Sequence, residues 1–268
     1  MTMDLQFRGK KAIVTGGSAG MGKAIARQLA REGCDVVVGA RTETRLQDAA
    51  AEIAEETGRN MVPLVVDTLD GASIEAFIQR AAEALGTIHI LVNCAARVGG
   101  TIPDSMETIS DAQIVKDFEE KFLGYYRCAR AAATYMKQAG WGRIVNLSGG
   151  AGRTPGTGIS TPARNIACVA LTKSLANTLG PYGINVNAIY PGTTMTEAVL
   201  QRLHEQAKRQ GKTLEAYLDE LRQGSVIRHL VSAEDVAQVV TFLCSPLAIS
   251  VTGEAISVSG GVNADMHY

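Results

Sequence analysis

The sequence lacks the features that mark several classes of protein. Its 268 residues include no uninterrupted apolar run of the roughly 18 residues that a membrane-spanning helix needs. The opening segment MTMDLQFRGKKAIVTGG has no long apolar stretch of the signal-peptide type. A formal net charge of -1, without blocks of like charge, offers no basic surface for nucleic acid. We therefore expect a cytoplasmic protein with neither a membrane nor a nucleic-acid partner.

Metal-binding patterns are also missing. The five cysteines are scattered, with no C-x-x-C pair and no Cys/His ligand spacing: Cys34, Cys94, Cys128, Cys168 and Cys244. The histidines show no metal spacing either: His89, His204, His229 and His267. The sequence predicts buried, reduced thiols, histidines with structural or solvated roles, and no metal site.

What the sequence does contain is a regular alternation of strand-like and helix-like segments. The short apolar runs are KAIVT, DVVVG, MVPLVV, IHILVN, RIVNL, INVNAI and AISVS. Segments with helical spacing separate them, such as the alanine-rich run from Thr44 to Thr57. This order predicts an α/β fold in which βαβ units build a doubly wound parallel sheet covered by helices on both faces.

One polar, helix-rich segment interrupts the alternation. It follows YPGTTMT and runs from Glu197 to about Gly224, which is far longer than an ordinary αβ loop. We expect a single domain, residues 1–268, in which this insertion of about 197–224 forms a helical lid. Its leucines, among them Leu203 and Leu218, fit either a lid over an apolar ligand or a plain amphipathic helix pair.

A glycine cluster, TGGSAGMG, joins the first expected strand to the first expected helix. Gly16, Gly20 and Gly22 allow backbone conformations and close approaches that a Cβ would prevent. With Ser18 and Met21, they form a turn whose amides can hold a pyrophosphate at a helix N-terminus. The alternative is a tight turn with no ligand, but its position between strand and helix favours dinucleotide binding.

The second expected strand indicates which dinucleotide. It ends in Ala40-Arg41-Thr42, where NAD-binding proteins often carry an acidic residue that binds the ribose. The Arg41 guanidinium suits a 2′-phosphate instead, so NADP(H) is favoured over NAD(H). The alternative is a solvated loop arginine.

Several motifs together resemble the short-chain dehydrogenase/reductase family: TGGSAGMG, the turn NCAA at Asn93 to Ala96, RIVNLS, and PYGINVNAIYPGTTMT. The similarity extends from about Lys10 to Asn263. It implies a seven-stranded Rossmann-type sheet, a small-molecule carbonyl or alcohol substrate, and a homodimer or homotetramer.

The resemblance also implies cofactor contacts at the ends of other strands. Asp67 matches the acid that contacts adenine, and Asn93 matches the asparagine that steadies the central sheet. Pro191, Gly192 and Thr196 match the P-G-x-x-x-T loop at the nicotinamide. As alternatives, Asp67 caps a helix, Asn93 closes a turn, and Pro191-Gly192 breaks the chain.

The four proton-handling residue types of the family are absent from their positions. The family uses a tyrosine whose pKa is lowered by a lysine, together with a serine and an asparagine. Counting back from LTKSLA places Thr161 at the tyrosine position and Asn165 at the lysine position. The IVNLS and KFLG segments place Gly149 at the serine position and Lys121 at the asparagine position.

Lysine and asparagine therefore exchange places, and Lys121 can extend its ammonium toward Asn165 if the helices pack as in the family. Tyr125 and Tyr190 are candidate substitute acids, with ordinary packing as the alternative. Thr161 is also readable as a helix N-cap before Pro162. Arg164 is either an anchor for an anionic substrate or a surface arginine, and Lys121 either a relay group or an exposed helical lysine.

Three functions fit these residues. The first is an NADP(H)-dependent oxidoreductase with a non-standard proton relay, which keeps the cofactor machinery in use. The second is a catalytically silent nucleotide-binding sensor or partner subunit. The third is a lyase or hydrolase on the same fold, because a fold alone does not determine the chemistry.

Overall fold

A computed structural model describes residues 4–96, 105–153 and 158–262 of the chain. Its sheet has seven parallel strands in the order β3-β2-β1-β4-β5-β6-β7. The strands are β1 (Lys11–Thr15), β2 (Asp35–Ala40), β3 (Met61–Val65), β4 (Ile90–Asn93), β5 (Gly142–Leu147), β6 (Ile184–Pro191) and β7 (Ala255–Val258). Each one matches a predicted apolar run, so the predicted fold class is confirmed.

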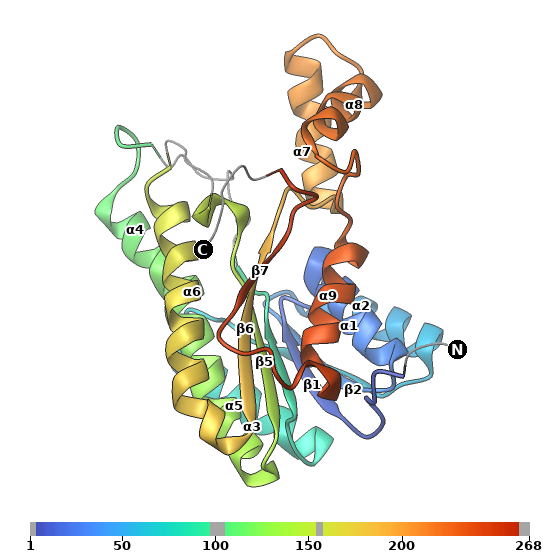
Figure 1. Ribbon diagram of the computed structural model, residues 1–268, viewed down its shortest axis with the longest axis vertical. Coiled ribbons are helices and arrows are strands. Elements are labelled where there is room, and N and C mark those ends of the chain that lie inside the picture. Colours follow the sequence, from blue (N-terminus) through green and yellow to red (C-terminus); the bar gives the residue numbers. More distant parts are fainter. Residues whose placement is uncertain (1–3, 97–104, 154–157, 263–268) are drawn as a thin grey trace.

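Helices cover both faces of this sheet (Figure 1). The helices are α1 (Gly20–Arg31), α2 (Glu43–Thr57), α3 (Gly71–Leu85), α4 (Asp111–Phe118), α5 (Gly124–Ala139), α6 (Ser160–Leu179), α7 (Glu197–Arg209), α8 (Leu214–Gly224) and α9 (Ala233–Cys244). One apolar cluster joins β-strand residues to α1, α2 and α9, and a second joins the sheet to α3, α5 and α6. The two clusters are the two halves of the core, because the buried strands present apolar side chains to both faces.

A short π-helical segment, η1 (Glu119–Leu123), links α4 to α5 without a break. The eight residues before it and the sixteen after it are α-helical, so the change of hydrogen-bonding pattern is local. Such π-bulges turn one part of a helix surface relative to the next and occur often at functional sites. Lys121 lies within this segment.

The predicted insertion forms two helices, α7 and α8, which project beyond the rest of the molecule (Figure 1). Thr196 caps α7 and Thr213 caps α8, each accepting a hydrogen bond from a backbone amide of the first turn. The pair encloses its own small apolar cluster around Val199, Leu203 and Leu218. The amphipathic pattern of the insertion therefore serves first to hold its two helices together.

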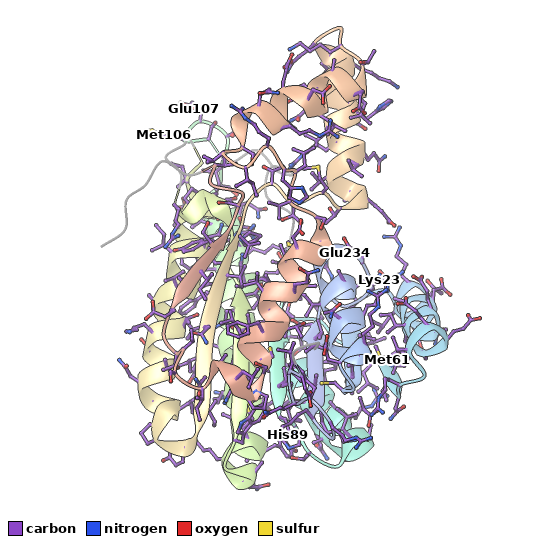
Figure 2. The ribbon with its side chains drawn as sticks, turned by 45° about the vertical axis from the view of Figure 1, so that its right-hand side comes forward. Lys23, Met61, His89, Met106, Glu107 and Glu234 are labelled. Atoms are coloured by element: carbon purple, nitrogen blue, oxygen red, sulfur yellow. The ribbon has the colours of Figure 1, made fainter. Side chains whose placement is uncertain are left out.

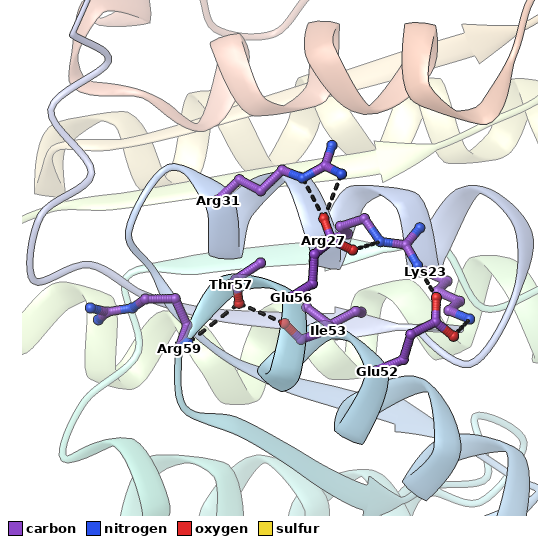
Figure 3. Close-up of polar contacts among 8 residues, drawn as sticks. All are labelled: Lys23, Arg27, Arg31, Glu52, Ile53, Glu56, Thr57 and Arg59. Atoms are coloured by element: carbon purple, nitrogen blue, oxygen red, sulfur yellow. Dashed lines mark hydrogen bonds and ion pairs between the residues drawn. The ribbon is translucent and has the colours of Figure 1, made fainter.

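Ion pairs connect α1 to α2 on the outside of the molecule (Figure 3). Arg27 Nε lies 2.9 Å from Glu56 Oε2, and Lys23 Nζ lies 2.6 Å from Glu52 Oε2. Arg31 Nη2 adds a contact of 2.5 Å to Glu56 Oε1. Because these groups are partly exposed, each pair contributes only about 0.5 kcal/mol.

No helix in the described part of the chain is long and apolar enough to span a membrane.

Candidate functional site

The glycine turn lies between the end of β1 and the start of α1. Gly16 and Gly20 have φ of 72° and 53°, in the left-handed region that glycine tolerates best. A Cβ on Gly22 would lie 2.1 Å from the backbone oxygen of Gly16, and a Cβ on Gly16 would lie 2.9 Å from the backbone nitrogen of Ala95. The backbone is therefore packed as closely here as the sequence predicts.

The N-terminus of α1 fits a pyrophosphate. Ala19, the N-cap residue, makes no side-chain hydrogen bond to the helix, and no acidic residue occupies the first turn. The first amides of α1 thus have neither a side-chain cap nor a competing carboxylate, which is the arrangement that anions favour. Ser18 and Met21 lie half-buried in the same turn.

The predicted adenosine contacts lie at the ends of β2 and β3. These two strands pair in parallel, so Arg41 and Asp67 both lie just beyond the carboxyl ends of neighbouring strands. Arg41 is exposed. Asp67 Oδ1 accepts a hydrogen bond from the amide of Leu69, whereas the N-cap of α3 is Asp70. The alternative that Asp67 caps this helix is therefore wrong.

Asn93, at the end of β4, is fully buried within a chain of polar side chains. Its Nδ2 donates to Asn146 Oδ1 at 2.9 Å and faces the carbonyl of Tyr125 at 3.4 Å. Asn146 Nδ2 then donates to Thr172 Oγ1 at 2.9 Å. Asn93 thus ties β4 to β5, η1–α5 and α6, which is more than closing a turn.

The P-G-x-x-x-T loop lies against the glycine turn. Pro191 is the last residue of β6, and the amide of Gly192 donates to Val258 at 2.9 Å. A Cβ on Gly20 would lie 3.3 Å from Thr196 Cγ2, so residues far apart in sequence meet here. The Thr196 hydroxyl accepts from the amide of Val199 at 3.3 Å and acts as a helix cap.

Three of the four predicted catalytic positions, Lys121, Gly149 and Asn165, meet where β5 ends and α6 begins, and Thr161 lies in the first turn of α6. Lys121 Nζ donates to Asn165 Oδ1 at 2.7 Å and to the carbonyl of Ser148 at 2.5 Å. Both Lys121 and Asn165 are buried, with 4% and 3% of their surface exposed. Lys121 is therefore not an exposed helical lysine, and its expected approach to Asn165 is confirmed.

Burial sets the acidity of this lysine. It lowers the pKa of Lys121 to about 8, since the charged form loses its hydration. Arg164 lowers the pKa further by repulsion, and the thiols of Cys94 and Cys168 act in the opposite direction. An amine with a pKa near the working pH can both donate and accept a proton.

Comparison with known proteins shows which family the chain belongs to. A family model described as Enoyl-(Acyl carrier protein) reductase matches residues 16–263. The short-chain reductase protein NovJ of Streptomyces niveus is 32% identical over 250 residues, which cover 93% of this chain and 92% of NovJ. The chain belongs to the short-chain dehydrogenase/reductase family.

Other relatives in this family are reductases by name. The 3-oxoacyl-[acyl-carrier-protein] reductase FabG of Aquifex aeolicus is 31% identical over 264 residues, which cover 97% of this chain and 100% of FabG. The structure of L-sorbose reductase from Gluconobacter frateurii, complexed with NADPH and L-sorbose, has a TM-score of 0.92 and 28% identity. The matched region covers 98% of this chain and 100% of the L-sorbose reductase chain. The predicted class, an oxidoreductase of the short-chain dehydrogenase/reductase type, is confirmed by these relatives.

The two tyrosines predicted as candidate substitute acids, Tyr125 and Tyr190, are both buried. Tyr125 is buried, its hydroxyl donates to the carbonyl of Leu147 at 3.1 Å, and burial raises its pKa well above the usual value. Tyr190 is buried against Arg153, whose Cζ lies 4.4 Å from the ring centroid, and burial raises its pKa too. This geometry gives neither phenol support as a substitute acid.

The structure corrects two interpretations of the start of α6. Thr161 is not the N-cap: the helix begins at Ser160, and its N-cap is Ile159. Arg164 is not on the surface, since only 3% of it is exposed, and its Nη1 lies 3.9 Å from Asp117 Oδ1. With a carboxylate facing this guanidinium, an anionic substrate has a competitor already in place.

Two of the thiols, Cys94 and Cys168, lie close enough to this corner to act on the charge of Lys121. Four cysteines are buried as predicted, but Cys94, in the turn after β4, is half-buried. His89 lies at the end of the sheet opposite Glu234 and the helical insertion (Figure 2). His229 Nε2 lies 2.7 Å from Asp235 Oδ2, and His267 is outside the described residues. Among the described residues, no group of three or more His, Cys, Asp or Glu side chains is placed to hold a metal.

A pocket lies at the base of the helical insertion. Its apolar wall comes from Met195, Leu221, Leu230, Val231 and Val262, and its polar wall includes Ser225, Glu220 and His229. The sequence pattern indicated apolar residues on the insertion, but not that the chain before α9 and after β7 would complete the wall.

Sequence reasoning also missed the part played by main-chain groups near Lys121. The carbonyl of Ser148 accepts from the ammonium, while Ser148 Oγ donates to the carbonyl of Asn165 at 2.9 Å. The only signal for Ser148 in the sequence was its place directly after the last residue of β5.

Proposed function

We propose that this chain is an NADP(H)-dependent oxidoreductase that interconverts a carbonyl and its alcohol through a non-standard active site. The observation that carries the proposal is the buried Lys121, which contacts Asn165 at the corner where the family places its proton-handling residues. Family membership supports the class of reaction, and the residues at this corner support the unusual relay.

The cofactor end of the proposal has three supports in the chain. The glycine turn and the uncapped start of α1 suit the pyrophosphate, and the exposed Arg41 suits a 2′-phosphate. Thr196 and the P-G loop lie beside the glycine turn, toward the nicotinamide end. The NADPH bound to the related L-sorbose reductase agrees with this choice. When bound, NADPH supplies a hydride to a carbonyl carbon.

Lys121 is the proposed proton donor to the carbonyl oxygen. With a pKa of about 8, Lys121 is protonated in most molecules at neutral pH. Its ammonium can release the proton at a small cost in free energy. Thr161 is an aliphatic alcohol whose pKa lies far above working pH, so it orients a substrate better than it protonates one. Reduction should therefore slow as pH rises through about 8.

The helical insertion acts, in this proposal, as a lid for the substrate. The apolar wall of the pocket at its base suits a carbonyl compound with an apolar body, while Glu220 and His229 suit a polar substituent.

We also propose a homodimer or homotetramer. Phe242, Leu247 and Ile249 are apolar and exposed, and they precede β7, an edge strand of the sheet. Light scattering coupled to gel filtration tests this assembly, and a monomer at micromolar concentration would contradict it.

The experiment that tests the function titrates NADPH and NADH by cofactor fluorescence and then measures turnover with a panel of ketones and alcohols. We expect saturable binding that favours NADPH. Lys121→Met, which keeps the volume and removes the charge, should lower kcat by about 10²-fold to 10⁴-fold. Thr161→Val should change kcat far less.

Other outcomes select the other functions. Tight NADPH binding without turnover over the whole panel would favour a nucleotide-binding sensor or partner subunit. Absence of nucleotide binding by the folded protein would favour non-redox chemistry on this fold.

A further inference from the structure

Gly149 lies directly against the side chain of Asn165. A Cβ on Gly149 would lie 2.6 Å from Asn165 Nδ2, 3.2 Å from Cγ and 3.3 Å from Oδ1. The backbone of Gly149 is extended, with φ of 170°, so its conformation does not itself require glycine. The requirement is one of space: the Asn165 amide occupies the volume that a side chain at position 149 would fill.

The opposite side of the same amide holds Lys121. Asn165 Oδ1 accepts from Lys121 Nζ at 2.7 Å, and the second acceptor is the carbonyl of Ser148, the residue before Gly149. Ser148 Oγ donates back to the carbonyl of Asn165 at 2.9 Å. The end of β5 and the first turns of α6 thus enclose the ammonium between two oxygens.

In the described part of the chain, the charge of Lys121 is acted on by Arg164 on α6, which repels it, and by the thiols of Cys94 after β4 and Cys168 on α6. The Tyr125 ring centroid, from α5, lies 5.9 Å from Nζ. Because the lysine is buried, the two oxygen acceptors compensate for part of its lost hydration.

We infer that Gly149 is a positioning residue: by lacking a side chain, it lets Asn165 turn its oxygen to Lys121 and hold the ammonium at the end of β5. Lys121, Gly149 and Asn165 then form one interlocked set, in which any single return to the family's usual residue disturbs the other two. The catalytic meaning of this set rests on the proposed function, whereas the placement of the ammonium does not.

A double-mutant cycle with a spectroscopic readout tests the inference. The full-length protein is labelled with [ε-¹³C]lysine, the Lys121 signal is assigned by its loss in Lys121→Arg, and its pKa is measured by NMR titration. Gly149→Ala should displace the Asn165 amide and lower the pKa of Lys121 by about one unit, since the ammonium loses an acceptor. Asn165→Ala should lower it similarly.

The double variant Gly149→Ala/Asn165→Ala shows whether Gly149 acts on Lys121 through Asn165. In the Asn165→Ala background, Gly149→Ala should change the pKa of Lys121 almost no further, because the Asn165 amide that the new methyl group would displace is absent. Gly180→Ala is the matched control: it adds the same methyl at the end of α6, where a Cβ meets nothing within 4 Å. It should leave the Lys121 titration unchanged.

The inference is overturned if Gly149→Ala leaves the Lys121 pKa at the wild-type value, or if its effect is equally large without Asn165. If Gly149→Ala does not fold, Asn165→Ala alone still decides, since an unchanged titration in that variant excludes a holding role for the amide. The titration needs no turnover, so a protein that reduces no carbonyl can still confirm the positioning.

Discussion

The two ends of the proposed site are built in different ways. The glycine turn is built from backbone in close contact, and a Cβ on Gly22 would lie only 2.1 Å from the Gly16 oxygen. The corner around Lys121 is built from interlocking side chains, with Lys121 Nζ 2.7 Å from Asn165 Oδ1. A substitution in the glycine turn meets backbone that has little freedom to move, whereas a substitution in the corner meets side chains that can rearrange.

The largest effect should come from breaking the glycine turn. Gly22→Ala places a methyl group against a backbone oxygen that cannot move freely, so the free energy of unfolding should fall by about 4 kcal/mol. NADPH affinity should fall by about 100-fold in any folded fraction. Urea unfolding and NADPH titration measure the two losses, with Gly180→Ala as the control for an added methyl group. Near-wild-type binding by Gly22→Ala would contradict the placement of the pyrophosphate.

The second effect concerns the buried charge in the other region. The pKa of Lys121 is about 8 in the folded protein and returns to its usual 10.5 on unfolding. Between these values the unfolded chain binds a proton that the folded chain does not, so the free energy of unfolding should rise with pH. Relative to Lys121→Met, the gain should approach about 3 kcal/mol between pH 8 and pH 10.5.

Urea unfolding of both proteins across this pH range makes the measurement. The pKa values of Cys94 and Cys168 are about 12 and about 11 with Lys121 present and would rise further without it. These buried thiols therefore stay protonated in both folded proteins over this range, and their contribution nearly cancels in the difference. A difference that stays flat or falls with pH would show that Lys121 is not a buried amine.

A smaller effect is expected on the preference for NADPH over NADH. Arg41→Ala should weaken NADPH binding about tenfold, because an exposed guanidinium–phosphate pair is partly screened by water, and should leave NADH binding unchanged. Arg80→Ala, on the exposed face of α3, is the control for loss of a positive charge. Equal losses for NADPH and NADH would place Arg41 away from the 2′-phosphate.

The smallest effect is expected outside both regions. Glu56→Gln removes the charge that pairs with Arg27 and Arg31 between α1 and α2, and should cost about 0.5 kcal/mol in low salt and less in high salt. NADPH affinity should stay at the wild-type value. A loss of affinity would mean that these ion pairs help to orient the glycine turn.

Much of the fold followed from short-range patterns. Each of the seven strands and the two helices of the insertion lies where apolar runs or amphipathic spacing predicted it. The start of α6 did not follow, because Thr161-Pro162 looks like a cap and first helical residue, whereas Ser160 is already helical and buried. Ser160 Oγ donates to Asp117 Oδ2 at 2.7 Å, and this partner is 43 residues away. A contact between residues so far apart in sequence cannot be predicted from the residues around Ser160 alone.

The sequence by itself determined the alternating α/β order and the glycine turn between the first strand and the first helix. These features follow from residue types at fixed spacing along one segment. Only the tertiary structure decided that Lys121 is buried, that Asn165 Oδ1 faces it, and that Gly149 leaves the room for this contact. Burial and acceptor geometry arise where β5, η1 and α6 meet, and the pKa of an amine depends on that surrounding rather than on its neighbours in the chain.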